Sequence, residues 1–398
     1  MKDEPTVTVT AKAHGMDGSL VAPDWSPLTL AELRTLLAQF PSLGEPIRIL
    51  SVSPRPFSAA GVVAVHNGQV FVKRHHRAVR DREGLHEEHR FLLHLLFRGA
   101  PVPRVLASVL GETAIEIGDW TYEVHETAAG IDLYEDAISW TPFRSAAHAH
   151  SAGQALARFH LAARCFADPP RKPRPLVASF TIMAASDPAR EMARYLAARP
   201  SLANHAAVNA CAEQALKLLA TFHSELASLL PALAPLWTHN DLHGSNLFWS
   251  DAGPKSDFTA RATAIIDFGF ADRTNAVHDL AHAIERNIVE WLALVQDGKQ
   301  PPAVHLDHLE ALLDGYESIR PLSLEEAAAL APMTALCHVE VALSEADYFL
   351  GVLRSEEKAA KAYDGWLVGH ARWFHSAAGR KLLDALRRRI GPQKAATP

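Results

Sequence analysis

The first hydrophobic pattern in the chain is a run of leucines between residues 28 and 40. The leucines recur every three or four positions, which places them on one face of a helix. Thr29 stands at the start of this run and Glu32 follows in the position typical of a capping box. The pattern predicts an amphipathic helix, whereas residues 1–27 show no periodicity and are predicted to form a mobile arm.

Short apolar segments separated by turn residues follow this helix and predict several strands. Strands are expected at 47–53, 62–66 and 69–73, with Asn67-Gly68 as the hairpin turn between the last two. A further hairpin is expected from 105–116 and 121–126, with Gly118-Asp119 at its turn. Residues 81–98 between these strand groups have the spacing of a helix.

The remainder of the chain is mostly helical in pattern. Helices are predicted within 145–230, interrupted at 167–187, where several prolines break the periodicity. Residues 281–398 are predicted to be almost entirely helical.

Composition narrows the class of protein. The chain has 398 residues, of which 48% are hydrophobic and 21% are charged, as in a soluble globular protein with a sizeable core. A net charge of −6 gives no electrostatic support for nucleic-acid binding. The three cysteines are widely spaced, and the N-terminal segment lacks the apolar core of a secretory signal. Since no run of 18 apolar residues occurs either, we expect a cytoplasmic protein without a membrane partner.

Two motifs near the middle of the chain carry candidate chemistry. The first is His239-Asn240-Asp241-Leu242-His243-Gly244-Ser245-Asn246, and the second is Asp267-Phe268-Gly269 at the end of an apolar strand. A carboxylate such as Asp241 can accept the proton of an attacking hydroxyl during phosphoryl transfer. The oxygens of Asn246 and Asp267 are hard ligands of the kind that hold Mg²⁺ on phosphates.

These motifs resemble those of the aminoglycoside phosphotransferase and choline kinase group, which has a protein-kinase-like fold. The resemblance implies an α+β fold with two lobes, a small N-terminal lobe built from an antiparallel sheet and a helix, and a large, mostly helical C-terminal lobe. The expected boundaries are an arm and helix over 1–46, a nucleotide-binding lobe over 47–126, and a catalytic and substrate-binding lobe over 127–398. ATP and Mg²⁺ are the implied cofactors.

The resemblance also assigns residues that bind the nucleotide phosphates. Lys73 ends an apolar strand and resembles the phosphate-binding lysine of kinases. Glu88, in the helix that follows, resembles the glutamate that holds this lysine. The link between the first two strands occupies the place of the phosphate loop but lacks G-x-G-x-x-G, so Ser58 and Gly61 are expected to approach the phosphates there.

Two further residues are expected to hold the catalytic loop in place, and one acidic segment bears on the acceptor. By resemblance, Asp279 is expected to brace the catalytic loop through hydrogen bonds to its backbone, and His239 is expected to orient that loop. Between residues 321 and 350 the chain has five acidic residues and no lysine or arginine. His338, Val341, Glu345 and Tyr348 share one helical face there, which suits either an amine-bearing acceptor or a solvated surface.

The sequence therefore predicts a kinase that transfers the γ-phosphate of ATP to a hydroxyl of a small aminoglycoside-, amino alcohol- or sugar-like molecule. A protein kinase is one alternative, but the segment between Asp267-Phe268-Gly269 and Asp279 is short and an Ala-Pro-Glu element is absent. The other alternative is a protein that binds a nucleotide as a scaffold and catalyses no reaction. The sequence leaves open the identity of the acceptor, the choice between ATP and GTP, and the oligomeric state.

Overall fold

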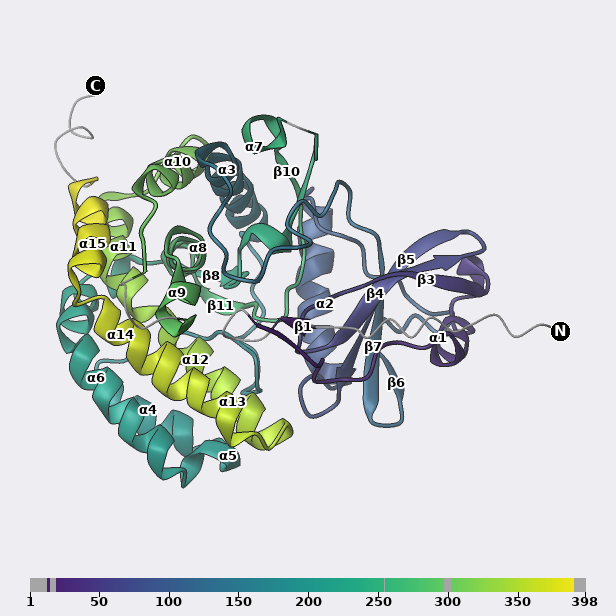
Figure 1. Ribbon diagram of the computed structural model, residues 1–398, viewed down its shortest axis with the longest axis horizontal. Helices are drawn as coiled ribbons and strands as arrows, with labels where there is room; N and C mark the ends of the chain where they lie inside the picture. Colours follow the sequence, from purple (N-terminus) through teal and green to yellow (C-terminus); the bar gives the residue numbers. More distant parts are fainter. Residues whose placement is uncertain (1–12, 15–18, 254, 297–301, 390–398) are drawn as a thin grey trace. The chain divides into compact units, whose positions relative to one another are not determined.

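The computed structural model describes residues 13–14, 19–253, 255–296 and 302–389 (Figure 1). By internal contacts the chain divides into two compact units. The first comprises Met1–Arg82 and Val105–Thr127, and the second comprises Glu83–Arg104 and Ala128–Pro398.

The first unit is built on an antiparallel sheet with the strand order β3-β4-β5-β7-β6. Its strands are β3 (Pro46–Val52), β4 (Ala59–Val65), β5 (Gly68–His76), β6 (Ile115–Ile117) and β7 (Trp120–Glu126). The hairpin between β4 and β5 is confirmed, but its turn lies at His66-Asn67, because Gly68 already pairs with Val65. Gly68 has a φ of 128°, a conformation that a side chain would oppose.

Two strand predictions in this unit are wrong. Strand β4 begins at Ala59, three residues before the expected start, so the link that precedes it is shorter than expected. Residues 105–116 form only the start of β6 and an isolated bridge between Val105 and His125. The hairpin turn at Gly118 is confirmed, with a φ of 61°.

The predicted first helix is α1 (Leu30–Leu37), and its capping box is present. The Glu32 backbone N–H donates to the Thr29 hydroxyl, and the Thr29 N–H donates to the Glu32 carboxylate. Leucines of this helix pack into the core of the sheet, which confirms the amphipathic pattern. The short strands β1 (Ala13–His14) and β2 (Leu20–Val21) pair with each other, so part of the predicted arm is ordered. Residues 1–12 and 15–18 of that arm lie outside the described residues.

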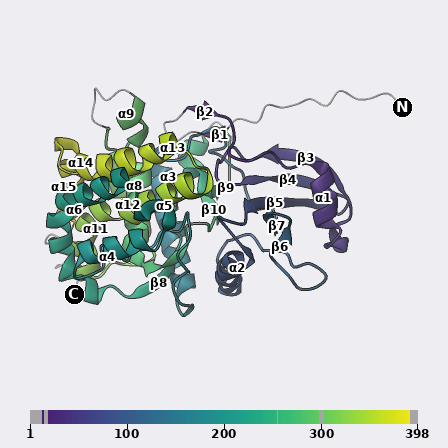
Figure 2. The same ribbon diagram turned by 90° about the horizontal axis from the view of Figure 1, so that it is seen from below.

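The second unit is mainly helical, as the sequence predicts. Its long helices are α2 (Arg82–Phe97), α3 (Ala146–Ala163), α4 (Pro188–Ala197), α6 (Ala206–Ala227), α8 (Ala276–Ile288), α10 (Leu306–Glu317), α11 (Leu324–Leu336), α12 (His338–Asp347) and α15 (Ala377–Arg388). Shorter α-helical segments are α5 (Pro200–Ala203), α7 (Ser256–Thr259), α9 (Trp291–Gln296), α13 (Glu356–Ala360) and α14 (His370–Trp373). The 3₁₀ turns are η2 (Leu230–Ala232) and η3 (Gly244–Asn246), and a further one, η1 (Pro41–Leu43), lies in the first unit. The segments η4 (Tyr348–Val352) and η5 (Lys361–Gly369) are π-helical. Helices α6, α11 and α15 lie side by side in both views (Figure 2).

Two antiparallel strand pairs carry the candidate motifs within this unit. Strand β8 (Pro235–Thr238) pairs with β11 (Asp272–Asn275), and β9 (Leu247–Trp249) pairs with β10 (Ala262–Ile265). The first motif follows β8 and the second follows β10, so the strand pairs bring both motifs into one region.

Helix α2 belongs to the second unit by its contacts, whereas the expected boundaries place it in the N-terminal lobe. The buried Phe91 of this helix packs against Phe159, Trp237 and Phe268, at ring-centroid distances of 5.9, 5.2 and 6.0 Å. These contacts tie α2 to the segment that carries Asp267-Phe268-Gly269.

One helical stretch, Leu324–Val352, is long and apolar enough to cross a membrane. Its most apolar window is 94% buried within the protein, as the core helices of soluble proteins are. The stretch is therefore weak evidence for a membrane span.

Candidate active site

The loop from His239 to Asn246 is held in place by a buried carboxylate. Asp279, in the first turn of α8, accepts the His239 backbone N–H at 2.8 Å and the Asn240 N–H at 2.7 Å. His160 Nε2 lies 3.0 Å from the same carboxylate. Burial by itself would raise the pKa of Asp279, but the hydrogen bonds from His160 and the loop hold it below its ordinary value. The predicted contacts of Asp279 with the loop backbone are thus present in the structure.

Two residues of the motifs have left-handed backbone conformations. Asn240 and Asp267 each have a φ of 61°. Asn and Asp tolerate this region better than other residues with a side chain. The Asn240 carboxamide is itself held, since its Oδ1 accepts from the Thr238 hydroxyl at 2.8 Å and its Nδ2 donates to the Ala178 carbonyl at 3.0 Å. The tight turn before Asp241 is therefore fixed by side-chain bonds.

The Asp241 carboxylate lies at the centre of the polar groups that the loop brings together. Asn246 Nδ2 donates to Asp241 Oδ2 at 3.2 Å and to its backbone carbonyl at 2.9 Å. Arg286 Nε lies 3.1 Å from Asp241 Oδ1, and His243 Nε2 lies 3.7 Å from Oδ2. The Asp241 side chain remains 13% exposed, so it is confined but reachable.

Burial raises the pKa of Asp241 to about 6. Arg286, His239 and the Asn246 hydrogen bond lower this pKa, while the charge of Asp267 raises it. A carboxyl with such a pKa is mostly ionised near neutral pH and is more basic than an ordinary aspartate. This is the behaviour expected of a group that accepts a proton from a hydroxyl.

The residue before Asp267, Ile266, bonds to the loop and so brings Asp267 beside it. The Ile266 N–H donates to the Asn246 carbonyl at 3.0 Å, and His239 Nε2 lies 2.9 Å from the Ile266 carbonyl. His239 therefore joins the two motifs, and its expected orienting role stays a prediction. The carboxylate of Asp267 and the amide of Asn246 supply hard oxygen donors, and this donor set fits a divalent cation such as Mg²⁺.

Arg286 is a residue that the sequence analysis missed. It is 2% exposed, and its guanidinium lies over the Trp140 ring at 5.0 Å from the centroid. It follows Asp279 by 286 − 279 = 7 positions, two helical turns, so both residues lie on one face of α8. This seven-residue spacing is the sequence signal that could have indicated that Arg286 approaches the loop.

Arg171 was also missed, since it lies in the proline-rich segment 167–187, where the helical periodicity breaks. It is 5% exposed, and its Nη1 lies 3.6 Å from Glu88 Oε2 and 3.2 Å from the Gly269 carbonyl. Its backbone N–H donates to Asp272 Oδ1 at 2.7 Å. Arg171 therefore connects α2 with the segment that follows Asp267, and Glu88 has a cationic neighbour within the second unit.

The remaining predicted site residues belong to the first unit. Lys73 lies in β5, opposite Ala60 of β4 and Glu123 of β7. Ser58 lies in the link before β4. The predicted pairing of Lys73 with Glu88 joins residues of different units and stays a prediction.

Gly61 lies within β4 and not in a loop. A Cβ at this position would come within 2.3 Å of the Ser51 carbonyl oxygen. The missing side chain is thus required for the approach of β3 to β4. The predicted contact of Gly61 with phosphate stays a prediction.

Comparisons with known proteins identify the family of the chain and its fold. A family model described as the phosphotransferase enzyme family matches residues 57–322. Among solved structures, amicoumacin kinase in complex with AMP-PNP, Ca²⁺ and Ami is 14% identical with a TM-score of 0.53, over 85% of this chain and 93% of that one. An aminoglycoside phosphotransferase from Alicyclobacillus acidocaldarius is 16% identical with a TM-score of 0.47, over 92% and 97% of the two chains. No curated protein matches the chain. The likeness to the amicoumacin kinase confirms the predicted two-lobed α+β fold.

Proposed function

Because the chain belongs to the phosphotransferase enzyme family, we propose that it transfers the γ-phosphate of ATP to a hydroxyl of a small molecule in the presence of Mg²⁺. Family membership confirms the predicted class, a phosphotransferase that acts on an alcohol group. The donor, the metal and the kind of acceptor are parts of the proposal.

The observation that carries the proposal is the setting of Asp241. Its carboxylate is partly exposed, is bonded by Asn246 and lies on a loop whose backbone Asp279 holds. In the proposed reaction Asp241 orients the acceptor hydroxyl and takes its proton late in the transfer. Asp279 and His239 keep the loop in position and do not exchange protons with the substrate.

The proposed contacts with the nucleotide and the metal are assigned residue by residue. Asn246 and Asp267 hold Mg²⁺, which neutralises charge on the phosphates. Lys73 binds the phosphates, Glu88 orients Lys73, and the link containing Ser58 approaches the phosphates through its backbone. The complex of amicoumacin kinase with AMP-PNP and Ca²⁺ supports a nucleoside triphosphate and a divalent cation as ligands.

We propose that residues 47–126 bind the nucleotide and that residues 127–398 bind the acceptor. By its contacts, α2 belongs to the second unit. The acceptor belongs to the hydroxylated aminoglycoside-, amino alcohol- or sugar-like compounds. The net charge of −6 argues against nucleic acid as a partner, and we propose a cytoplasmic enzyme.

A screen of ATP consumption across hydroxylated amines, sugars and aminoglycosides tests the proposal. We expect ADP to form with at least one such acceptor, together with a phosphorylated product identified by mass spectrometry. ATP and Mg²⁺ binding without turnover across the whole library would favour the nucleotide-binding scaffold. Phosphate transfer to proteins alone would favour a protein kinase.

A further inference from the structure

Residues 171–182, which we call the strap, lie in the second unit and form neither a helix nor a strand. Both ends of the strap are nevertheless buried, since Arg171 and Ile182 are 5% and 0% exposed. A buried segment without regular secondary structure must find hydrogen-bond partners elsewhere in the fold. The strap finds partners in the segment that follows Asp267, in the loop that carries Asp241, and in α12.

The first anchor of the strap is the buried carboxylate of Asp272. Its Oδ1 accepts the Arg171 backbone N–H at 2.7 Å, and its Oδ2 accepts the Ser179 hydroxyl at 2.6 Å. Asp272 begins β11 and follows Asp267 by 272 − 267 = 5 positions. One carboxylate therefore binds the strap at two points, 179 − 171 = 8 positions apart, and ties both points to the segment after Asp267.

The Arg171 guanidinium binds the turn that follows Asp267. Its Nη1 donates to the carbonyl oxygens of Gly269 at 3.2 Å and Ala271 at 3.3 Å, and its Nη2 donates to that of Gly84 at 2.9 Å. Gly84 belongs to α2. Because a guanidinium is planar and holds its N–H groups in a fixed arrangement, it restrains these three carbonyls relative to one another. One buried side chain therefore holds the turn and α2 together.

Another contact links the strap to the loop that carries Asp241. The Ala178 carbonyl accepts from Asn240 Nδ2 at 3.0 Å, and the Ala178 N–H donates to the Phe270 carbonyl at 3.3 Å. Asn240 directly precedes Asp241, and Phe270 belongs to the turn after Asp267. A single residue of the strap thus bonds to both motifs.

The far end of the strap is bound by Glu340 of α12. Its carboxylate accepts the backbone N–H groups of Thr181 and Ile182 and the Thr181 hydroxyl, and the bond from Ile182 measures 2.6 Å. Between the anchors, the buried Leu176 has a φ of 57°, which a bulky side chain disfavours. Backbone strain of this kind persists where surrounding contacts impose it, and it clusters at functional sites. The anchors, and not local preference, therefore fix the path of the strap.

We propose that the strap positions Asp267 relative to the loop that carries Asp241 and Asn246, with Arg171 and Asp272 as its positioning residues. Neither of these two residues touches the substrate, and both act through the backbone of the turn that follows Asp267. Groups that hold metal ligands in place tune the affinity for the metal although they do not touch it. The inference rests on the proposed function, in which Asn246 and Asp267 hold Mg²⁺.

The first test measures ADP binding by calorimetry, once with Mg²⁺ and once with EDTA. If Asp267 and Asn246 bind the metal, Mg²⁺ should tighten ADP binding to the wild-type protein. Arg171→Met removes the N–H donors, and we expect it to make this gain about tenfold smaller, as loss of an outer partner of a metal ligand does. Arg171→Lys should lie between the two, since it keeps the charge but not the planar fork.

The affinity for ADP in EDTA separates positioning of the metal site from a general structural role. We expect Arg171→Met to leave this affinity unchanged. An equal loss of ADP affinity with Mg²⁺ and with EDTA would show a general structural role and would overturn the inference. Lys172→Met is the control within the strap, because the Lys172 ammonium is exposed and pairs with Glu83 at the surface. It should keep the full gain from Mg²⁺.

Two milder variants decide the question if Arg171→Met does not fold. Ser179→Ala removes one hydrogen bond to Asp272, and Glu340→Gln weakens the far anchor. Each should lower the gain from Mg²⁺ by about threefold to tenfold, the effect of roughly one hydrogen bond. Circular dichroism of each variant is the control for folding.

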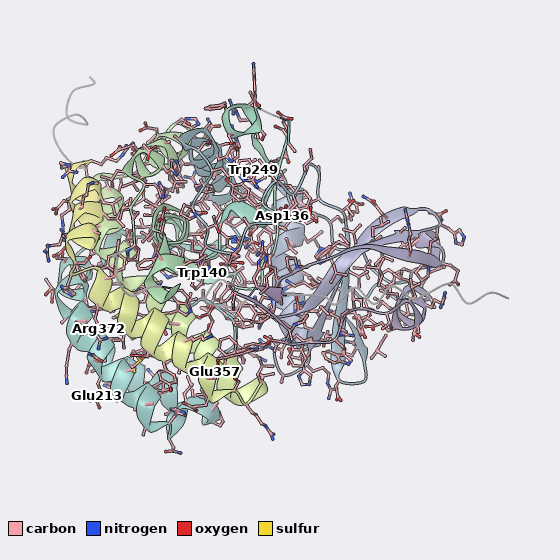
Figure 3. All side chains as sticks on the ribbon, in the orientation of Figure 1. Asp136, Trp140, Glu213, Trp249, Glu357 and Arg372 are labelled. Carbon is pink, nitrogen blue, oxygen red and sulfur yellow. The ribbon has the colours of Figure 1, made fainter. Side chains whose placement is uncertain are left out.

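Two matched substitutions are the controls for these variants. Ser224 is exposed on α6, where its hydroxyl donates to the Ala220 carbonyl. Glu357 lies on α13 with an exposed side chain (Figure 3). Ser224→Ala and Glu357→Gln should leave the gain from Mg²⁺ unchanged. If folded Ser179→Ala and Glu340→Gln also leave it unchanged, the strap only stabilises the fold and the inference is wrong.

The two proposals fail in different ways. If the strap variants lower the gain from Mg²⁺ but no acceptor consumes ATP, the strap assignment stands and the phosphotransfer assignment fails. If an acceptor is phosphorylated and the strap variants bind ADP with Mg²⁺ as the wild type does, the phosphotransfer assignment stands and the strap assignment fails. If Mg²⁺ does not tighten ADP binding to the wild type, the metal assignment and the strap assignment both fail.

Discussion

Arg286 Nε lies 3.1 Å from Oδ1 of Asp241, and both side chains are largely buried. The guanidinium comes from α8, the same helix whose Asp279 accepts two N–H groups of the loop. One helix therefore fixes both the backbone and the carboxylate of the proposed base. Arg286 acts as a positioning residue through Asp241.

Replacement of Arg286 should lower turnover. Arg286→Met removes a charge-assisted contact, and we expect kcat/KM to fall about 10- to 100-fold. Arg286→Lys retains the charge but not the planar fork and should lie between Met and wild type. Steady-state kinetics with circular dichroism as the control for folding measure this. Equal activity of Arg286→Met and wild type would show that Arg286 is not needed to position Asp241.

Asp279→Asn should weaken the loop and the fold together. An asparagine offers one acceptor where the carboxylate accepts from His239, Asn240 and His160. We expect a loss of about 1–3 kcal/mol in the free energy of unfolding, measured with urea. Asp384→Asn, on the exposed face of α15, should change it by less than about 0.5 kcal/mol. A similar midpoint for both variants would contradict the bracing role.

Much of this arrangement is readable in the sequence because it depends on local chemistry. The Thr29 and Glu32 pair predicts the start of α1, since capping involves neighbouring residues. The two motifs predict the loop and the Asp267 turn, because Asn and Asp accept the left-handed backbone that both turns require.

The residues that the sequence does not reveal act over long separations. Arg171 lies in a proline-rich segment, and only the folded chain brings it beside Glu88 and Gly269. Trp140 and Glu345 are 345 − 140 = 205 positions apart, and both line one small hollow beside Arg286. The start of β4 was misplaced because small residues such as Ala59 and Ala60 give little strand signal.

Close packing of α3 on α10 should make two glycines indispensable. A Cβ at Gly153 would lie 2.0 Å from the Leu312 carbonyl oxygen, and one at Gly315 would lie 2.0 Å from that of His150. We expect Gly153→Ala to destabilise the protein by about 1–3 kcal/mol through overpacking. Gly365→Ala, where no atom lies within 4 Å of the added carbon, should be neutral or stabilising. Thermal unfolding of the two variants decides this, and equal melting temperatures would refute the packing argument.

Stability should depend on pH through Glu345. Its pKa is about 8 in the folded protein against an ordinary value of 4.5, so the folded state binds the proton more tightly. The resulting stabilisation is complete below about pH 4.5 and is lost as pH rises towards 8. Glu345→Gln lacks this loss, so its stability relative to wild type in urea unfolding should rise between about pH 4.5 and about pH 8 and level off above that pH. A constant difference between the two proteins would show that Glu345 does not titrate in this range.

The most direct test of the account is the turnover of Asp241→Asn with an acceptor identified by the ATP-consumption screen. The amide keeps the shape of the side chain but cannot take the proton, so we predict that kcat falls about 10²- to 10⁴-fold while nucleotide binding is retained. Wild-type turnover in a folded Asp241→Asn protein would contradict the assignment of Asp241 as the base.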